Sequence, residues 1–310
     1  MNVAAAVSLA VSLPMPQAPV TVRVPEALPA AVGERLAEWG GTGWVVAVGD
    51  AGDLGPATPE VLLLWDEWTL ARAAAAGGEI VALPFADRVV VAADAALLAA
   101  GEFEPTWESI ALAPALHDRL GLADAAVCGA AWLAALRARL GRGDDEAAGL
   151  ALWTTLDARA GRACGSVAQL REGLLAGRYA AAIGPDGWFA DLPTRAAGAL
   201  RRMPLAGSPI RRGIAVTAGA DTRTYAVATA LLASEWQRDL AAAGGFGLLP
   251  PAAPSLEPAA ARRWWGRYVG EVRARGRAVE ELADWLDLAF GIGFLVAAFL
   301  LYRALRKAPV

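Results

Sequence analysis

Short apolar runs alternate with helical segments along the first hundred residues, and this alternation limits the fold more than any other feature. The run EVLLLW at 60–65 is apolar on both faces, as in a strand buried on both sides of a sheet. It leads directly into DEWTLARAAAAGG at 66–78, which has the composition of a helix. Strands at this spacing from helices predict an α/β fold with a largely parallel sheet. Further strands are predicted at 20–24, 44–48 and 88–94.

The middle of the chain is more helical, with helices expected at 128–141 and 144–157, and a lone strand follows at 213–219. In the stretch ACGSVAQLREGLLAGRYAAAIGPDGW, Ser166 and Gln169 have the spacing of a capping box at a helix start. Ser234 and Gln237 have the same spacing. Two helices with the same start signal are therefore predicted: a short apolar strand at 179–183 follows the first, and the second is the later of two helices after the strand at 213–219.

The composition excludes several classes of function. Apolar residues make up 56% of the 310 residues and charged residues 19%, which argues against disorder. A net charge of −4 argues against a nucleic-acid-binding surface over the whole protein. Two cysteines and one histidine are too few for a Cys/His zinc site. His117 is the only candidate base for a Ser-His-Asp or Cys-His scheme, and it lies in a polar loop, so no enzyme activity, metal or cofactor is predicted.

The C-terminal region is the most apolar part of the chain. No charge occurs in the fifteen residues from Leu288 to Tyr302. A helix of this length covers about 22 Å, and extension to Trp285, with Arg303 reaching the interface, brings it close to the roughly 30 Å hydrocarbon core. We therefore predict a transmembrane helix at 286–303; a buried core helix is the alternative.

The regions beside this helix and at the N-terminus carry weaker signals. The arginine-rich segment 253–285 predicts a long helix that either packs on the body or lies along the membrane surface. Residues 304–310 form a short tail. Residues 1–18 contain an apolar run but no basic region, which makes them an atypical signal segment.

Three segments resemble the substrate-binding proteins of ABC transporters, in the type II group that includes ferric-iron, thiamine and phosphonate binders. They are EVLLLWDEWTLARAAAAGG at 60–78, PFADRVVVAADAALLAAGEFEPTWESIA at 84–111, and LAGSPIRRGIAVTAGADTRTYAVATALLASEWQRDLAAAGGFGLLP at 205–250. The resemblance runs from about Val20 to Pro250 and rests on the order of these segments. It implies two α/β lobes, with RVVVAAD and GIAVTAG crossing between them. Lobe I would contain 19–92 and 215–252, and lobe II 93–214.

The resemblance also implies that a ligand is held between the lobes by loops at strand ends. Ser166 and Asp66 also read as simple helix caps, and Trp65 as a core residue, so both interpretations stay open. Ferric-binding relatives use an adjacent tyrosine pair, which this chain lacks, so direct iron binding of that kind is not expected. The implied ligand-binding residues are Glu26, Trp65, Asp66 and Glu67 in lobe I and Cys128, Gly129, Gly165, Ser166, Asp186 and Trp188 in lobe II.

Two cysteines begin two helices of the same expected lobe, which suggests a disulfide between Cys128 and Cys164; small buried thiols are the alternative. The function expected from the resemblance is a membrane-anchored extracytoplasmic solute-binding protein with a small-molecule ligand and an ABC permease as partners. It would be a single-pass protein of the inner (cytoplasmic) membrane, with its main domain on the periplasmic or extracellular side. A sensory or assembly module with a weakened ligand site is the alternative.

Overall fold

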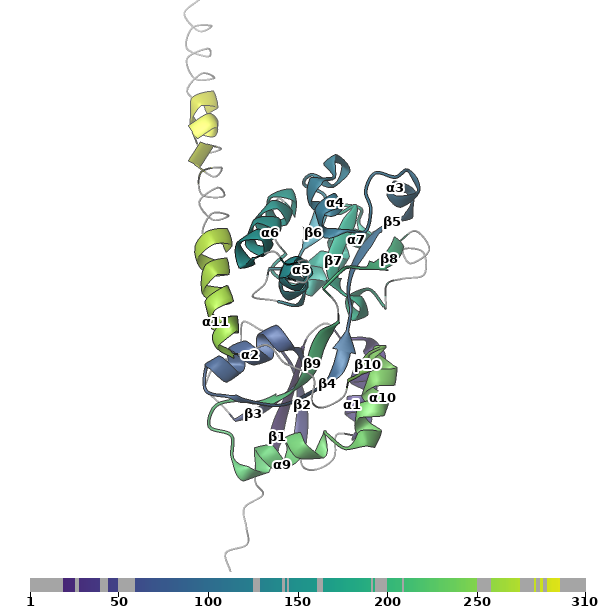
Figure 1. The fold of residues 1–310 in the computed structure, drawn as a ribbon, viewed down its shortest axis with the longest axis vertical. Helices are drawn as coiled ribbons and strands as arrows, with labels where there is room; N and C mark the ends of the chain where they lie inside the picture. The colour runs from purple at the N-terminus through teal and green to yellow at the C-terminus, as the bar shows by residue number, and fades with distance from the viewer. Residues whose placement is uncertain are drawn as a thin grey trace, which may run out of the picture.

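The structure, a computed structural model, has two α/β lobes and a C-terminal helix that lies beside them (Figure 1). Glu26, Cys128, the expected signal segment 1–18 and the tail 304–310 lie outside the described residues. The structure describes residues 19–25, 28–39, 44–49, 59–124, 129–140, 143, 145–160, 164–190, 192, 200–207, 209–249, 258–273, 282, 285–286 and 289–295.

Lobe I is built on a mixed sheet with the strand order β10-β4-β9-β3-β1-β2. β1 pairs in parallel with β2 and β3, whereas β9 runs antiparallel to both β3 and β4. The sheet is therefore less uniformly parallel than the sequence pattern suggested. Its strands are β1 (Val20–Pro25), β2 (Trp44–Gly49), β3 (Glu60–Asp66), β4 (Glu79–Asp87), β9 (Ile210–Val216) and β10 (Gly247–Leu248).

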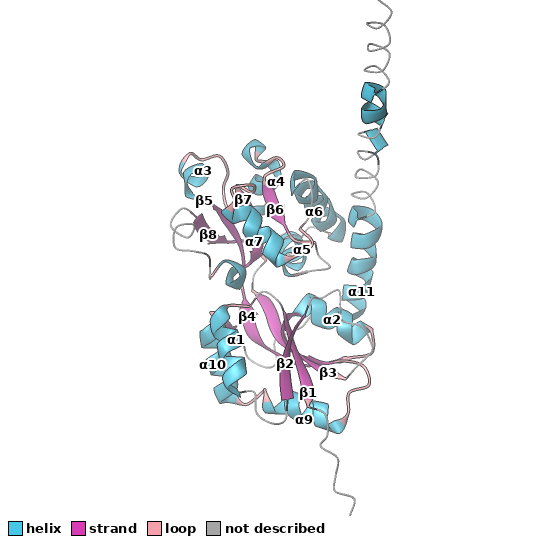
Figure 2. Cartoon of the chain, turned by 180° about the vertical axis from the view of Figure 1, so that it is seen from behind, coloured by secondary structure: helices cyan, strands magenta, loops and turns pink. Residues whose placement is uncertain are grey.

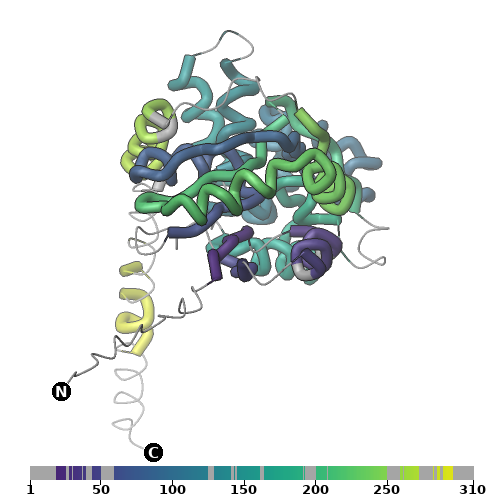
Figure 3. The backbone as a smooth tube through the Cα atoms, turned by 90° about the horizontal axis from the view of Figure 1, so that it is seen from below, coloured from purple at the N-terminus to yellow at the C-terminus, as the bar shows by residue number. Residues whose placement is uncertain are grey.

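Helices cover the lobe I sheet and close its core. Figure 3 shows α10, in green, next to α1, in purple. The core between sheet and helices includes Val22, Leu36, Ile214 and Leu240, all fully buried. The helices are α1 (Ala30–Trp39), α2 (Glu67–Ala75), α9 (Thr222–Ala230) and α10 (Ser234–Gly244).

Lobe II has a smaller sheet with the order β6-β7-β5-β8, in which only β6 and β7 are parallel. Figure 2 shows its helices gathered around this sheet. Its strands are β5 (Val89–Asp94), β6 (Leu120–Leu122), β7 (Ala181–Pro185) and β8 (Leu200–Pro204). Its helices are α3 (Ala95–Ala99), α4 (Trp107–Leu112), α5 (Ala130–Leu140), α6 (Glu146–Ala160) and α7 (Val167–Leu175), with 3₁₀ turns η2 (Pro114–Leu116) and η3 (Asp186–Phe189).

The chain crosses between the sheets twice. β4 ends at Asp87 in the lobe I sheet and β5 begins at Val89 in the lobe II sheet. The return crossing lies between Pro204, which ends β8, and Ile210, which begins β9. Both crossings come before the expected boundaries at 92–93 and 214–215, because β5 and β9 each pair within a single sheet.

Several local predictions agree with the structure and others do not. The Ser166 hydroxyl accepts from the N–H of Gln169, and the Gln169 side chain accepts from Gly165 N–H rather than from Ser166. Ser234 is not a cap: α10 is capped at Ala233 without a side-chain hydrogen bond, and the Gln237 amide donates to a carbonyl five residues earlier. Strands β4, β6, β8 and β10 were not predicted from the sequence, because each is short or broken by proline and takes its place from its neighbours.

The described part of the arginine-rich segment, 258–273, packs on the body, as in the first of the two interpretations. It contains α11 (Pro258–Arg267) and the π-helical turn η4 (Tyr268–Arg273). Among the described residues, no helix has both the length and the apolar character needed to cross a membrane. Of the expected span 286–303, only Leu286 and 289–295 are described.

Candidate functional site

The carboxyl ends of β1 and β3 in lobe I meet two segments of lobe II. After β1, Pro29 lies against η3, where a Cβ added to Gly187 would come 3.5 Å from the proline ring. After β3, Trp68 of α2 lies against Gly129, where an added Cβ would overlap the indole ring. We call this region, which comprises Pro29, 65–68, Gly129 and 186–188, the interlobe junction. It brings together most of the described residues that were expected to bind ligand.

Asp66 caps α2 and is almost completely buried. Its carboxylate accepts from the backbone N–H groups of Trp68 and Thr69, each at 3.1 Å, and from the Thr69 hydroxyl at 3.0 Å. Loss of solvation on burial raises the pKa of Asp66, while the nearby Arg212 guanidinium opposes this shift. Asp66 therefore acts as a helix cap whose hydrogen-bonding capacity is directed inward.

Glu67 forms an ion pair across the two lobes. Its side chain is 0% exposed, and both oxygens accept from Arg137 of α5, at 2.6 and 2.8 Å. The backbone N–H of Arg211, in β9, donates to the same carboxylate at 3.0 Å. This bidentate geometry joins α2 to lobe II and occupies a carboxylate that the sequence offered for ligand binding.

Trp65 lies in the core of lobe I, where it is 2% exposed and donates through its indole N–H to the Arg23 carbonyl at 3.0 Å. A bulge brings it there: Leu64 has φ of 62°, and the pairing of β3 with β9 shifts between Leu63 and Trp65. Arg212 donates to the Leu64 carbonyl at 2.9 Å and holds the bulge in place. Of the two interpretations of Trp65, the core residue is therefore the correct one.

The lobe II residues after β7 also have protein partners. Asp186 accepts from Arg88 at 3.0 Å and from Arg202 at 2.9 Å. Trp188 is buried, and its ring covers Gly184, where an added Cβ would collide with it. Asp186 thus fixes η3 to the first chain crossing, while Trp188 belongs to the lobe II core.

Cys164 is a free, buried thiol, so the expected disulfide with Cys128 is absent from this structure, and the alternative of a small buried thiol holds for Cys164. Its sulfur lies 3.1 Å from the Tyr179 hydroxyl. This hydrogen bond and partial burial raise the pKa of Tyr179 to about 12. Gly165 and Ser166, which follow, form the helix cap described above.

The arrangement resembles solved structures of periplasmic binding proteins. The periplasmic binding protein P5PA matches with a TM-score of 0.63 and 14% identity over 83% of this chain and 100% of that one. The periplasmic binding protein AfuA from Actinobacillus pleuropneumoniae, with fructose-6-phosphate bound, matches with a TM-score of 0.61 and 13% identity over 82% of this chain and 98% of that one. The sulfate-binding protein SubI from Mycobacterium tuberculosis matches with a TM-score of 0.58 and 17% identity over 76% of this chain and 88% of that one.

The chain has the fold of a periplasmic binding protein. This confirms, at the level of fold, the resemblance carried by the three sequence segments. No protein-family model matches the chain, and no curated protein matches it either.

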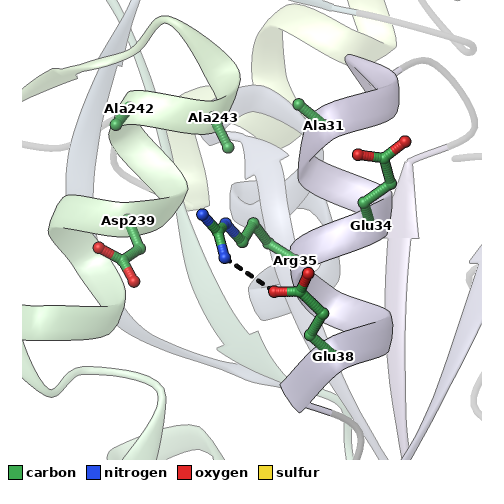
Figure 4. Close-up of a pocket in the computed structure, with 7 residues that line it drawn as sticks. All are labelled: Ala31, Glu34, Arg35, Glu38, Asp239, Ala242 and Ala243. Carbon is green, nitrogen blue, oxygen red and sulfur yellow. Dashed lines mark hydrogen bonds and ion pairs between the residues drawn. The ribbon is translucent and has the colours of Figure 1, made fainter.

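A groove of about 350 Å³ that sequence reasoning missed lies between α1 and α10 of lobe I (Figure 4). Its polar side chains are mostly acidic, and its one arginine, Arg35, donates to Glu38 at 2.8 Å. Helical spacing of the acidic residues on α1 was visible in the sequence, but nothing there showed that α10 would face them. The groove is lined by Ala31, Glu34, Arg35, Glu38, Asp239, Ala242 and Ala243.

No group of three or more His, Cys, Asp and Glu side chains within the described ranges could hold a metal ion. Two carboxylates of the interlobe junction are paired with arginines, Glu67 with Arg137 and Asp186 with Arg88, and the third, Asp66, caps α2. The chemistry available at the junction is therefore hydrogen bonding and packing.

Proposed function

We propose that the protein is an extracytoplasmic solute-binding protein that captures a small molecule between its lobes and delivers it to an ABC permease. The observation that carries this proposal is the construction of two sheets joined by two crossings, with the carboxyl ends of β1 and β3 facing lobe II. Ligands of open α/β sheets bind at such strand ends. The similar structures, whose names include sulfate-binding, iron-bound and spermidine/putrescine transporter proteins, support the same class.

The ligand would lie at the interlobe junction, on the side where Pro29 approaches Gly187. The other contact between the lobes, after β3, is filled by Trp68 over Gly129 and by the Glu67 ion pair. In this arrangement Asp66 and Glu67 position α2 rather than touch the solute.

A second candidate function is a sensory or assembly module with the same fold and a weakened ligand site. This second function is favoured because the residues expected to bind ligand already have protein partners or are buried. Asp66, Glu67 and Asp186 each accept hydrogen bonds from protein donors, and Trp65 and Trp188 are buried. Such a protein would keep the lobes and lose the affinity for a solute.

Thermal unfolding of the full chain separates the two candidates. A ligand at a hundred times its Kd stabilises the folded state by about 2.7 kcal/mol, which raises the Tm by several degrees. The panel contains oxyanions, divalent and ferric ions, polyamines, sugar phosphates and amino acids. A shift with one class supports the solute-binding protein, and no shift with any class supports the module.

A pair of glycine variants locates the site once a ligand class is found. Gly187→Leu would place a large side chain against Pro29 and should abolish the Tm shift. Gly33→Leu, on the exposed face of α1 with no atom near its added Cβ, is the matched control and should keep it. Loss of the shift in both variants, or in neither, would contradict this location.

The proposal extends to membrane attachment through 286–303, with the lobes on the extracytoplasmic side. Support comes from the uncharged run Leu288–Tyr302 and from the exposure of large apolar side chains within it, including Phe290 and Phe294 at 75% each. In membranes washed with alkaline carbonate, the full chain should stay in the pellet. The double variant F294R/L295R should be released, because both residues lie at the middle of 286–303 and each arginine near the centre of a span costs about 2.5–3.5 kcal/mol. Release of the unmodified chain would refute the anchor.

A further inference from the structure

α2 belongs to lobe I by its place after β3, but one face of it is part of the lobe II core. Trp68 is fully buried in the hydrophobic cluster formed by the lobe II strands and helices. Its ring covers Gly129, at the start of α5, so closely that no side chain fits there. Trp132 of α5 packs edge-on against it, with ring centroids 6.4 Å apart. This contact exists only while the lobes are together.

α11 and the turn η4 that follows it lie over this contact, and together they touch both lobes. On the lobe I side, the Arg72 guanidinium stacks 4.0 Å from the Trp265 ring, and Trp265 also packs edge-on against Trp68. On the lobe II side, Tyr268 packs on Trp132 at 5.5 Å and donates through its hydroxyl to Asp124 at 3.1 Å. Figures 1 and 2 both show α11 beside α2, from where it continues along lobe II.

Aromatic burial accounts for most of this docking. Trp264 and Tyr268 are at most 9% exposed, and buried aromatic pairs and a cation–π contact are favourable beyond the area that they bury. Glu146 of α6 also pairs with Arg263 and Arg267, at 3.0 and 3.3 Å. Arg263 is more than half exposed, so its ion pair adds little.

We propose that α11 and η4 form a clasp whose docking is coupled to closure of the lobes. The surface that the clasp binds is made partly by α2 and partly by lobe II, and it is complete only while Trp68 covers Gly129. Separation of the lobes removes one half of that surface and releases the clasp; closure restores it. The coupling is reciprocal, so loss of the clasp favours separation. It links the interlobe junction to the chain beyond Arg273, whether or not a solute occupies the junction.

Trp265→Ala in the full chain tests one direction of the coupling. This change removes the stacking on Arg72 and Trp68, and we expect amide hydrogen exchange in α2 to accelerate by about tenfold or more, with an increased radius of gyration in small-angle X-ray scattering. Leu112→Ala is the control, because Leu112 in α4 of lobe II is 66% exposed, and it should change neither quantity. Unchanged α2 exchange and an unchanged radius of gyration in Trp265→Ala would overturn the proposal.

Gly129→Ala tests the other direction, because the added Cβ displaces Trp68 and α2 from lobe II. Amides of 258–273 should then exchange about tenfold faster, while β1 and β7 keep their protection and show that both lobes are folded. Gly33→Ala is the control. Faster α2 exchange with unchanged protection of α11 would refute the coupling. If β1 and β7 also lose protection, the variant is unfolded and the Trp265→Ala result decides.

Discussion

Replacement of Arg137 by methionine should destabilise the protein more than replacement of its partner Glu67 by glutamine. The reason is the unequal burial of the pair: the Glu67 side chain is 0% exposed, whereas the Arg137 side chain is 29% exposed. In Arg137→Met the buried carboxylate keeps only the N–H of Arg211, at 3.0 Å. In Glu67→Gln the remaining guanidinium can still reach water.

The expected magnitudes follow from this geometry. Removal of one partner of a buried ion pair costs about 3–5 kcal/mol, which applies to Arg137→Met. In Glu67→Gln one side-chain oxygen still accepts from Arg137, so the loss is that of one hydrogen bond to a charged group, about 1.5–3 kcal/mol. Replacement of both residues by methionine should cost less than Arg137→Met alone, because no charge is then left in the junction.

Urea unfolding of the full chain, followed by tryptophan fluorescence, measures these differences. Arg178→Met is the matched control: it breaks the exposed pair with Glu172, whose side chains are 57% and 71% exposed, and should cost less than about 1 kcal/mol. The reasoning fails if the loss of unfolding free energy in Arg137→Met is equal to or smaller than that in Glu67→Gln. It also fails if that loss is equal to or smaller than the loss in the double variant, because the buried carboxylate then does not depend on Arg137.

Three further predictions concern single groups. Burial raises the pKa of Asp66 above its unfolded value of about 3.9, so the contribution of Asp66 to stability is fully present below that value and is lost as pH rises through the folded pKa. Asp66→Asn keeps the helix cap and should flatten the decline of the unfolding free energy above about pH 4. An equal decline in the variant would refute this. Gly213→Ala should lower the Tm by several degrees, because its Cβ would collide with a β4 carbonyl, whereas Gly33→Ala in α1 should not lower it. Tyr179 should ionise at a pH of about 12 by ultraviolet titration, and Cys164→Ala should lower that value; an unchanged value would contradict the hydrogen bond.

The sequence by itself determined the elements whose signals are local. The run EVLLLW forms β3 and the segment after it forms α2. Both could be predicted because an uninterrupted apolar stretch and a helix start are patterns of residues that are adjacent in the sequence. The Ser166 cap and the Asp66 cap were visible for the same reason. Their order also carried the resemblance to the substrate-binding proteins of ABC transporters, and that resemblance implied the two-lobed fold.

Only the tertiary structure decided what the candidate site residues do. Glu67 is separated from Arg137 by 70 positions, and Trp68 meets Gly129 across the two lobes. The sequence does not distinguish a glutamate that faces a solute from one that faces an arginine of the other lobe, because the difference depends on which distant part of the chain packs against it. The same holds for α11: the sequence predicted a helix in this segment, but the surface that the helix binds is formed by two lobes and is complete only when the lobes have come together.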